Sequence, residues 1–149
     1  MVVQRALEQR IQEGVLKRLY MVHNIENTHW VAVEVDVTAS QIRIGDSLEW
    51  NRSCSDLVTG LNAWLSTTLH QPFKVSYDLP HGKQQDTYSC GICSINAIEH
   101  RIVPSIPLWT PALRHVIRME KFGEIARRYL DQVCLDALVG LLPETTTVR

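Results

Sequence analysis

The chain has 149 residues, of which 45% are apolar and 21% charged, and its formal net charge is −1. This length suits one domain of ordinary globular composition, and the near-zero charge excludes the basic surface of a protein that binds nucleic acid or an anionic membrane. The sequence has no apolar run long enough for a membrane span and no signal-peptide pattern. We therefore expect one soluble intracellular domain over residues 1–149, nuclear or cytoplasmic, with its four cysteines reduced.

The first half of the chain combines helical and strand patterns. Residues 3–19 have apolar residues at roughly helical spacing and predict a helix, weakened by Gly14. Residues 29–37 and 41–47 each alternate between apolar and polar residues, which predicts an antiparallel hairpin joined by a short link at 38–40. A further helix is expected to begin at Ser55 and Asp56 and to continue to about Leu69.

The second half is predicted to be mainly helical. Residues 73–79 resemble a third strand, and after Cys90 four isoleucines recur at spacings of three, three and four, typical of a helix with one apolar face: Ile92, Ile95, Ile98 and Ile102. Thr110 and Pro111 begin a region that is mostly helical to about Leu142. Strands followed by helices, without regular βα alternation, indicate an α+β fold with an antiparallel or mixed central sheet flanked by helices.

Residues 84–93, QQDTYSCGIC, contain a Cys-x-x-Cys pair that is compatible with three chemistries. A redox pair of the thioredoxin type belongs to a βαβ unit, and no such pattern surrounds this one. A zinc site needs a second pair of ligands, and the other His and Cys residues are scattered. Cys93 is expected in the core, one helical turn after Cys90. Cys90 itself lies between a polar loop and a helix N-terminus, where the helix dipole favours a nucleophilic thiolate that needs no metal or organic cofactor.

A nucleophilic cysteine requires a base and a group that orients the base. His29 opens the first predicted hairpin strand and Asp46 closes the second. If Val31 faces Ile44, His29 and Asp46 are direct cross-strand neighbours, with Cβ atoms about 5 Å apart. Asp46 would then accept a hydrogen bond from Nδ1–H of His29 and leave Nε2 to take the thiol proton. Asp36, the alternative aspartate, falls in the turn in this register.

The loop before Cys90 offers a donor for the negative charge that develops on a carbonyl oxygen during nucleophilic attack. Gln84 and Gln85 precede Cys90 by six and five residues, and a glutamine amide is a donor that does not titrate. The backbone N–H of Cys90 is a second candidate donor. Gly91 has no side chain that would obstruct a substrate.

The order His, Asp, Gln, Cys resembles that of the ubiquitin-like-protein-specific cysteine proteases, which remove SUMO and its relatives and to which adenovirus endopeptidase is distantly related. The matching segments are HWVAVEVD, GDSL with Asp46 seventeen residues after His29, and QQDTYSCG. They cover about residues 18–102, and residues 103–149 correspond to the closing helices of that family. The resemblance implies a papain-like site in permuted order, with the nucleophilic cysteine at a helix N-terminus.

The resemblance also implies the role of each residue and the substrate. The nucleophile, the base, the orienting group and the oxyanion donor would be, in that order, Cys90, His29, Asp46 and Gln84. Trp30 would help to form a narrow tunnel for a Gly-Gly tail, although packing on the sheet is the alternative for this side chain. The expected reaction is hydrolysis of the peptide or isopeptide bond after the C-terminal Gly-Gly of SUMO or another ubiquitin-like modifier.

The sequence departs from the family pattern at three places. Trp30 is the first tryptophan in the chain, whereas the family's second tunnel tryptophan comes from an earlier segment, which this chain would then lack. Ser89 stands where an aspartate is usual, and Asp86 with Thr87 where Asn-Gly is common. Two other functions stay open, an acetyltransferase of the same clan and a non-catalytic module that binds a ubiquitin-like protein. The sequence leaves open which modifier is bound and what the oligomeric state is.

Overall fold

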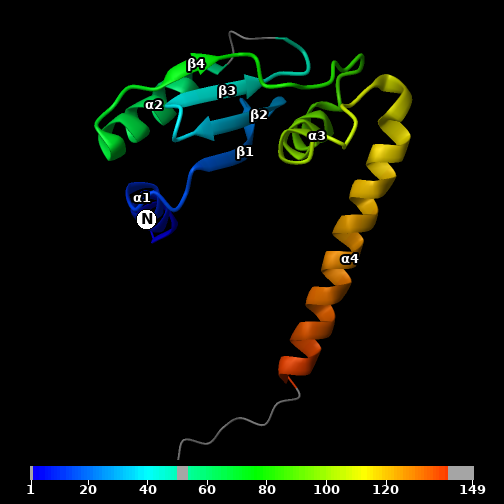
Figure 1. Cartoon of the computed structure of the whole chain (residues 1–149). Coiled ribbons are helices and arrows are strands. Elements are labelled where there is room, and N and C mark those ends of the chain that lie inside the picture. Colours follow the sequence, from blue (N-terminus) through cyan, green and yellow to red (C-terminus); the bar gives the residue numbers. More distant parts are fainter. Residues whose placement is uncertain (1, 50–53, 141–149) are drawn as a thin grey trace, which may run out of the picture. The chain divides into compact units, whose positions relative to one another are not determined.

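The computed structural model describes residues 2–49 and 54–140 (Figure 1). These residues fall into two compact units, one within residues 1–112 and the other within 113–149. In the first unit the described residues form a four-stranded sheet with helices, and in the second they form chiefly one long helix, α4 (Arg114–Gly140).

The sheet has the strand order β1-β2-β3-β4. Strand β2 (His29–Asp36) is antiparallel to both of its neighbours, β1 (Arg18–Ile25) and β3 (Gln41–Gly45). The short β4 (Lys74–Ser76) lies parallel to β3, and helix α2 (Ser55–Leu69) connects the two. The mixed sheet with its helices confirms the predicted α+β class, although β3, α2 and β4 form one βαβ unit that the sequence did not predict. The third predicted strand, at 73–79, is shorter than expected.

The N-terminal region differs from its prediction. Helix α1 (Val2–Gln12) ends before Gly14, whose φ of +68° is a conformation that glycine adopts without strain. The chain then forms β1, so the predicted helix over residues 3–19 is wrong beyond Gln12. Six consecutive residues of β1 are half-buried, so the strand has no alternation by which the sequence could have revealed it.

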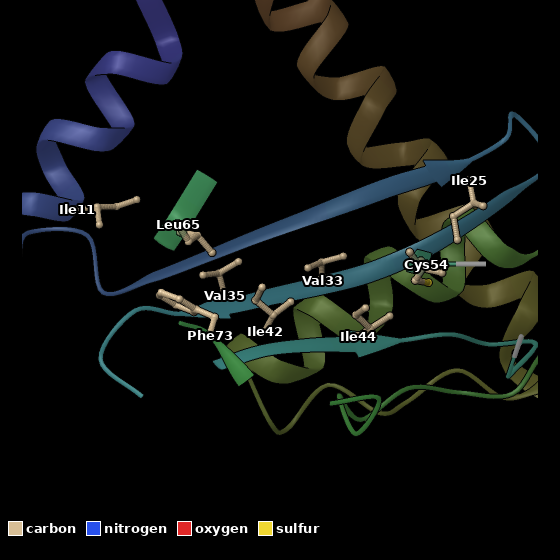
Figure 2. Close-up of a cluster of buried hydrophobic side chains, with 10 residues drawn as sticks. Ile11, Ile25, Val33, Val35, Ile42, Ile44, Cys54, Leu65 and Phe73 are labelled. Atoms are coloured by element: carbon tan, nitrogen blue, oxygen red, sulfur yellow. The ribbon is translucent and has the colours of Figure 1, made fainter. Parts of the chain in front are cut away.

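The main hydrophobic core lies on one face of the sheet (Figure 2). The alternating residues of β2 and β3 are completely buried there: Val31, Val33, Val35, Ile42 and Ile44. Helix α1, helix α2 and the segment before β4 add Ile11, Leu65 and Phe73, in that order. Each such side chain contributes about 1.5–3 kcal/mol when it is removed from water. The apolar alternation of the hairpin therefore fixes which face of each strand points inward.

Helix α3 (Cys90–Ile102) packs against the opposite face of β2 and also contacts β1. The helix and the buried place of Cys93 were predicted. The small residues Ser94 and Ala97 are buried with Cys93, whereas two of the four isoleucines, Ile95 and Ile102, are 39% and 57% exposed. Ala97 packs with Ala32 of β2 and with Leu79, and the partly buried Ile98 packs against the same cluster. Small side chains let the helix approach the sheet closely, and Ile95 and Ile102 are left exposed.

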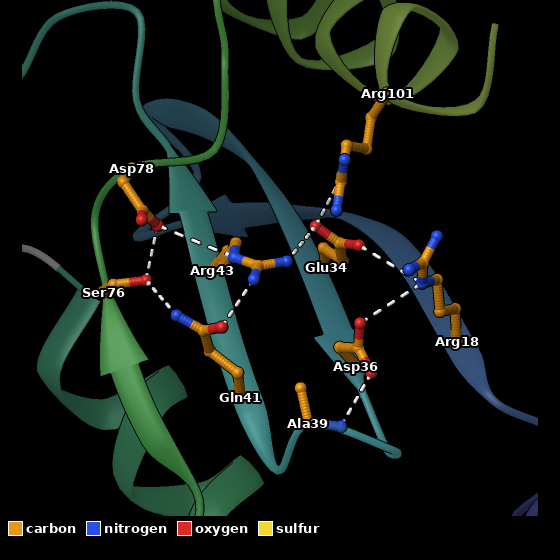
Figure 3. A network of polar contacts seen from close by, with 9 residues as sticks. All are labelled: Arg18, Glu34, Asp36, Ala39, Gln41, Arg43, Ser76, Asp78 and Arg101. Atoms are coloured by element: carbon orange, nitrogen blue, oxygen red, sulfur yellow. Dashed lines mark hydrogen bonds and ion pairs between the residues drawn. The ribbon is translucent and has the colours of Figure 1, made fainter.

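A buried carboxylate holds the C-terminal end of α3 (Figure 3). The side chain of Glu34 on β2 is fully buried and is surrounded by three guanidinium groups: Arg18 at 3.8 Å, Arg43 at 3.3 Å and Arg101 at 2.9 Å. Arg101 lies in the last turn of α3, and its hydrogen bond to Glu34 raises the pKa of its guanidinium. The charged network therefore holds the C-terminal end of α3 on the sheet.

Asp36 completes this network at the end of β2. We predicted that Asp36 lies in the turn, but it pairs with Gln41 of β3. Its carboxylate accepts hydrogen bonds from Arg18 and from the N–H of Ala39. Burial would raise the pKa of Asp36, but these two hydrogen bonds outweigh it, so the pKa lies below its usual value.

The C-terminal unit is helical, as expected from Thr110 and Pro111. A short 3₁₀ turn, Pro111–Leu113, precedes α4, which extends to Gly140; the last two residues of the predicted helical region, 141 and 142, lie outside the described residues. Within residues 2–49 and 54–140, no helix combines the length and the apolar content that crossing a membrane requires.

Candidate active site

The central feature of the site is a buried pair formed by His29 and Asp46. Nε2 of His29 lies 2.7 Å from Oδ1 of Asp46, and the two side chains are only 2% and 1% exposed. His29 is the first residue of β2, and Asp46 directly follows the last residue of β3. The structure thus brings together the two residues that the sequence paired.

The register that creates this contact is not the one we expected. Val33, not Val31, faces Ile44, so every partner is shifted by two residues. Because side chains alternate with a period of two, this shift leaves both residues on the predicted face. Asp46 thereby becomes a diagonal neighbour of His29 rather than the direct one, and diagonal pairs lie about 7–8 Å apart at the backbone.

The shift also changes which imidazole nitrogen binds the carboxylate. We predicted that Nδ1–H would donate to Asp46, but the donor is Nε2, the ring nitrogen farther from the backbone and better placed to reach a diagonal partner. A carboxylate only accepts, so Nε2 carries the hydrogen in the neutral ring and Nδ1 is the basic nitrogen. The base predicted for the thiol proton is therefore Nδ1 of His29, not Nε2.

Gln84 is buried and its amide is held on both sides. The hydroxyl of Ser47 donates to Oε1 of Gln84 at 2.6 Å, and Nε2 of Gln84 donates to the carbonyl of Asp86 at 2.6 Å. Gln85 is exposed to solvent. The structure therefore singles out Gln84, the glutamine that the family resemblance selected.

The segment before Cys90 is shaped by Asp86. One oxygen of its carboxylate accepts hydrogen bonds from the N–H groups of Tyr88 and Ser89, and the other accepts from the Ser89 hydroxyl at 2.6 Å. The carboxylate of Asp86 thus reaches the position before the cysteine, where the family usually has an aspartate and this chain has Ser89. The departures from the family pattern at Asp86 and at Ser89 are therefore linked. Cys90 then begins α3, as predicted.

Ser94 connects the helix of Cys90 with the strand of His29, and no pattern in the sequence predicts this role. Its buried hydroxyl lies 3.0 Å from the carbonyl oxygen of Trp30 and 2.9 Å from that of Cys90. A hydroxyl has one proton, so the two carbonyls share it. The backbone that follows His29 is thereby fixed beside the first turn of α3.

An open cavity of about 600 Å³ lies beside Cys90. Its lining includes Trp30 and Gly91, the two residues predicted to bind substrate, and its other residues are uncharged: Val22, Thr28, Thr87, Tyr88, Ile92 and Ile95. Trp30 is 40% exposed within a strand that is otherwise buried. A Cβ added to Gly91 would lie 3.6 Å from the Trp30 ring, so this ring forms a wall of the cavity next to the cysteine.

The loop that carries Gln84 is anchored two residues earlier, at Gly82. A Cβ at Gly82 would lie 2.1 Å from the carbonyl oxygen of Trp109, so only glycine fits. Trp109 is itself held by Asn96 of α3, whose Oδ1 accepts from its N–H at 2.6 Å while Nδ2 donates to the carbonyl of Pro107 at 3.0 Å. Helix α3 therefore supports the glutamine loop as well as the cysteine.

The remaining cysteines are free thiols in the structure, and Cys93 is buried, which confirms its predicted place in the core. Cys54 is also buried, and desolvation, together with the charge of Asp46, raises the pKa of its thiol to about 11. Among the described residues, no group of three or more His, Cys, Asp or Glu side chains is arranged to hold a metal ion.

A cysteine at a helix N-terminus, a buried His–Asp pair on adjacent strands and a held glutamine define the class of papain-like cysteine peptidases, in permuted order. The chain belongs to the Ulp1 protease family, since the model of that family's C-terminal catalytic domain matches residues 16–107. This confirms the resemblance drawn from residues 18–102, and the matched region contains all four predicted catalytic residues.

Solved structures agree with the fold. A SUMO protease Ulp1 with its catalytic cysteine oxidised to a sulfenic acid matches with a TM-score of 0.62 and 22% identity, over 80% of this chain and 57% of that chain. The C-terminal Ulp1 protease domain in complex with SMT3, the yeast ortholog of SUMO, matches with a TM-score of 0.53 and 20% identity, over 73% and 51% of the two chains. The chain thus spans little more than half the length of these structures. No curated protein sequence matches it.

Proposed function

We propose that the protein is a cysteine protease that hydrolyses the bond after the C-terminal Gly-Gly of a ubiquitin-like modifier, with SUMO as the first candidate. The observation that carries the proposal is the buried contact between His29 and Asp46, because a fixed imidazole is what a thiol nucleophile needs as its base. Membership of the Ulp1 protease family supports the same chemistry.

The proposed reaction uses these groups in turn. Nδ1 of His29 takes the proton of Cys90, and the thiolate attacks the carbonyl carbon of the terminal glycine. The carbonyl oxygen becomes an oxyanion, which receives hydrogen bonds from the Gln84 amide and the backbone N–H of Cys90. The His29 imidazolium, stabilised by Asp46, returns the proton to the leaving amine as the thioester forms. A water molecule then hydrolyses the thioester with His29 as base and restores the thiol.

The cavity beside Cys90 supports a substrate whose terminal residues have no large or charged side chains. Its walls are uncharged, and the Trp30 ring lies against the position of Gly91. A Gly-Gly tail could pass along this ring, whereas a branched side chain would have to displace it. The apolar faces of Ile92 and Ile95 extend the groove away from the cysteine and are available to the residues before the tail.

The test is the intact mass of the protein after incubation with C-terminal electrophile probes of SUMO, a NEDD-type modifier and ubiquitin. We expect one probe to form a covalent adduct with the wild-type protein and none with Cys90→Ser. Cys90→Ala should abolish turnover of the same modifier while the circular dichroism spectrum stays unchanged. Retained turnover in Cys90→Ala would refute the assignment of the nucleophile. Binding of a modifier without any adduct would support the non-catalytic module instead.

A further inference from the structure

Ser47 lies between the two halves of the proposed catalytic machinery. It directly follows Asp46 in a tight turn, which is closed by a hydrogen bond from the N–H of Glu49 to the carbonyl of Asp46 at 2.9 Å. Oδ1 of Asp46 also accepts from the N–H of Leu48 at 2.9 Å. The turn that orients the histidine thus presents the Ser47 side chain, which is buried, on the segment that meets the glutamine loop.

Two hydrogen bonds join Ser47 to Gln84. The backbone N–H of Gln84 donates to the carbonyl of Ser47 at 3.1 Å, and the Ser47 hydroxyl donates to Oε1 of Gln84 at 2.6 Å. The first bond holds the loop against the turn. The second acts on the amide group itself, which is the part of Gln84 that would contact an oxyanion.

The direction of the amide follows from its neighbours. The carbonyl oxygen of Asp86 only accepts, so the group 2.6 Å from it must be the NH₂ of Gln84 and not its oxygen. Oε1 therefore faces Ser47, and the hydroxyl must be the donor. One Nε2 hydrogen is used by Asp86, and the second is left for a developing negative charge.

We propose that Ser47 is a positioning residue that holds the Gln84 amide in the orientation needed to stabilise the oxyanion. The inference rests on the proposed function, because it assigns a role within that reaction. Without the hydroxyl, Oε1 loses its donor and the amide gains freedom to rotate. A rotated amide directs its oxygen, rather than a hydrogen, at the oxyanion and repels it.

Kinetics of four proteins test this role: wild type, Ser47→Ala, Gln84→Ala and the double variant. The substrate is the modifier that forms the Cys90 adduct, with a fluorogenic amide at its C-terminus. Loss of an oxyanion donor lowers kcat by about 10²- to 10³-fold, so we expect that for Gln84→Ala and about 5- to 30-fold for Ser47→Ala, with KM changed less than about twofold. If Ser47 acts through Gln84, the double variant should be no slower than Gln84→Ala alone. Independent, multiplying losses would overturn the proposal.

Two further variants separate positioning from stability. Ser66→Ala is the matched control, since the Ser66 hydroxyl also donates to a side-chain amide oxygen, that of Asn62 at 3.1 Å, but in helix α2. It should leave kcat unchanged even if it lowers the melting temperature as Ser47→Ala does. Ser47→Thr keeps the hydroxyl and should restore most of the lost kcat. A kcat that falls equally in the control, or is not restored by threonine, would contradict the proposal.

A spectroscopic measurement decides the question without turnover. The side-chain amide signals of Gln84, identified by their loss in Gln84→Ala, should differ from those of the exposed Gln85 in ¹⁵N–¹H spectra. In Ser47→Ala they should move toward the Gln85 values, whereas in Ser66→Ala they should stay. Unchanged Gln84 signals in Ser47→Ala would overturn the positioning role, whichever substrate the enzyme takes. Failure of all three modifier probes would instead refute the proposed function and leave this measurement valid.

Discussion

Replacement of Gly82 by alanine tests whether the glutamine loop is built against α3 as described. The added Cβ would lie 2.1 Å from the carbonyl oxygen and 2.6 Å from the Cβ of Trp109, and real Cβ atoms essentially never approach other heavy atoms within 3.0 Å. The obstacle is chiefly backbone, and Asn96 fixes this segment by accepting from the N–H of Trp109 and donating to the carbonyl of Pro107. The strain therefore cannot be relieved by turning a side chain, and the loop that carries Gln84 has to move.

The expected loss is at the upper end of the range for overpacking, about 3 kcal/mol. For a unit of this size each kcal/mol lowers the melting temperature by about 4–8 °C, so Gly82→Ala should melt roughly 12–24 °C below wild type. Turnover should fall as well, because Gln84 is only two residues away. The melting temperature is followed by circular dichroism and turnover by the fluorogenic modifier substrate.

Gly60→Ala is the matched control for this experiment. A Cβ at Gly60 meets no atom within 4 Å, and the residue lies inside helix α2. Alanine there should raise stability by about 0.5–1 kcal/mol, since glycine is a poor helix former. We therefore predict that alanine lowers the stability at Gly82 and raises it at Gly60. A Gly82→Ala protein that melts within a degree of wild type would refute the packing argument.

Three other predictions concern buried charge. Asp46→Asn keeps an acceptor for His29 but removes the charge that stabilises the imidazolium, so kcat in the fluorogenic assay should fall by roughly 10- to 100-fold, and by about 10²- to 10⁴-fold in Asp46→Ala. Glu34→Gln leaves three guanidinium groups around a neutral amide and should lower the urea-derived free energy of unfolding by about 1–3 kcal/mol. The thiol of Cys54 has its pKa raised from 9.0 to about 11, so the folded protein keeps this proton after the unfolded chain has lost it. Stability that Cys54 contributes below pH 9 is therefore lost as the pH rises toward 11, by about 2–3 kcal/mol.

Each of these has its own control. Wild-type kcat in Asp46→Ala would show that His29 needs no orienting group. The exposed Glu13→Gln should change the free energy of unfolding by less than about 0.5 kcal/mol, and a Glu34→Gln protein no less stable than that would contradict the role of the network. Cys54→Ala lacks the titrating thiol, so its stability relative to wild type should improve between pH 9 and pH 11. Parallel pH curves for the two proteins would contradict the raised pKa.

Some strands and the pairing of two catalytic residues could be predicted from the sequence, whereas strand β1 could not. Val31, Val33 and Val35 alternate because one face of β2 is buried, and this pattern is visible without a structure. The residues of β1 are half-buried on both faces, so nothing in their order distinguishes a strand from the helix predicted there. The assumed hairpin register identified His29 and Asp46 as a pair although it was wrong by two residues, because an error of two residues does not change the face on which they lie.

The finer geometry could not be predicted, for identifiable reasons. The turn after β2 has no Asn-Gly or Asp-Gly to fix its register, and without the register the nitrogen of His29 that meets Asp46 cannot be assigned. Ser47 and Ser94 have no sequence signature, because a serine hydroxyl gains its role only from the acceptors that the fold places beside it. The isoleucine spacing correctly predicted α3 but could not show that Ile92 and Ile95 line a cavity, since an apolar helix face can line a cavity as well as a core.

Helix α3 is held by Ser94, near Cys90, and by Arg101 of the last turn, which contacts Glu34. Its two faces therefore have different roles. The inward face determines where the nucleophile lies. The outward face, with Ile92 and Ile95, lines the cavity beside Cys90. Substitutions at those two positions can therefore redirect the choice of substrate without moving the reacting sulfur. Related enzymes could diverge in selectivity along this face while their chemistry remains the same.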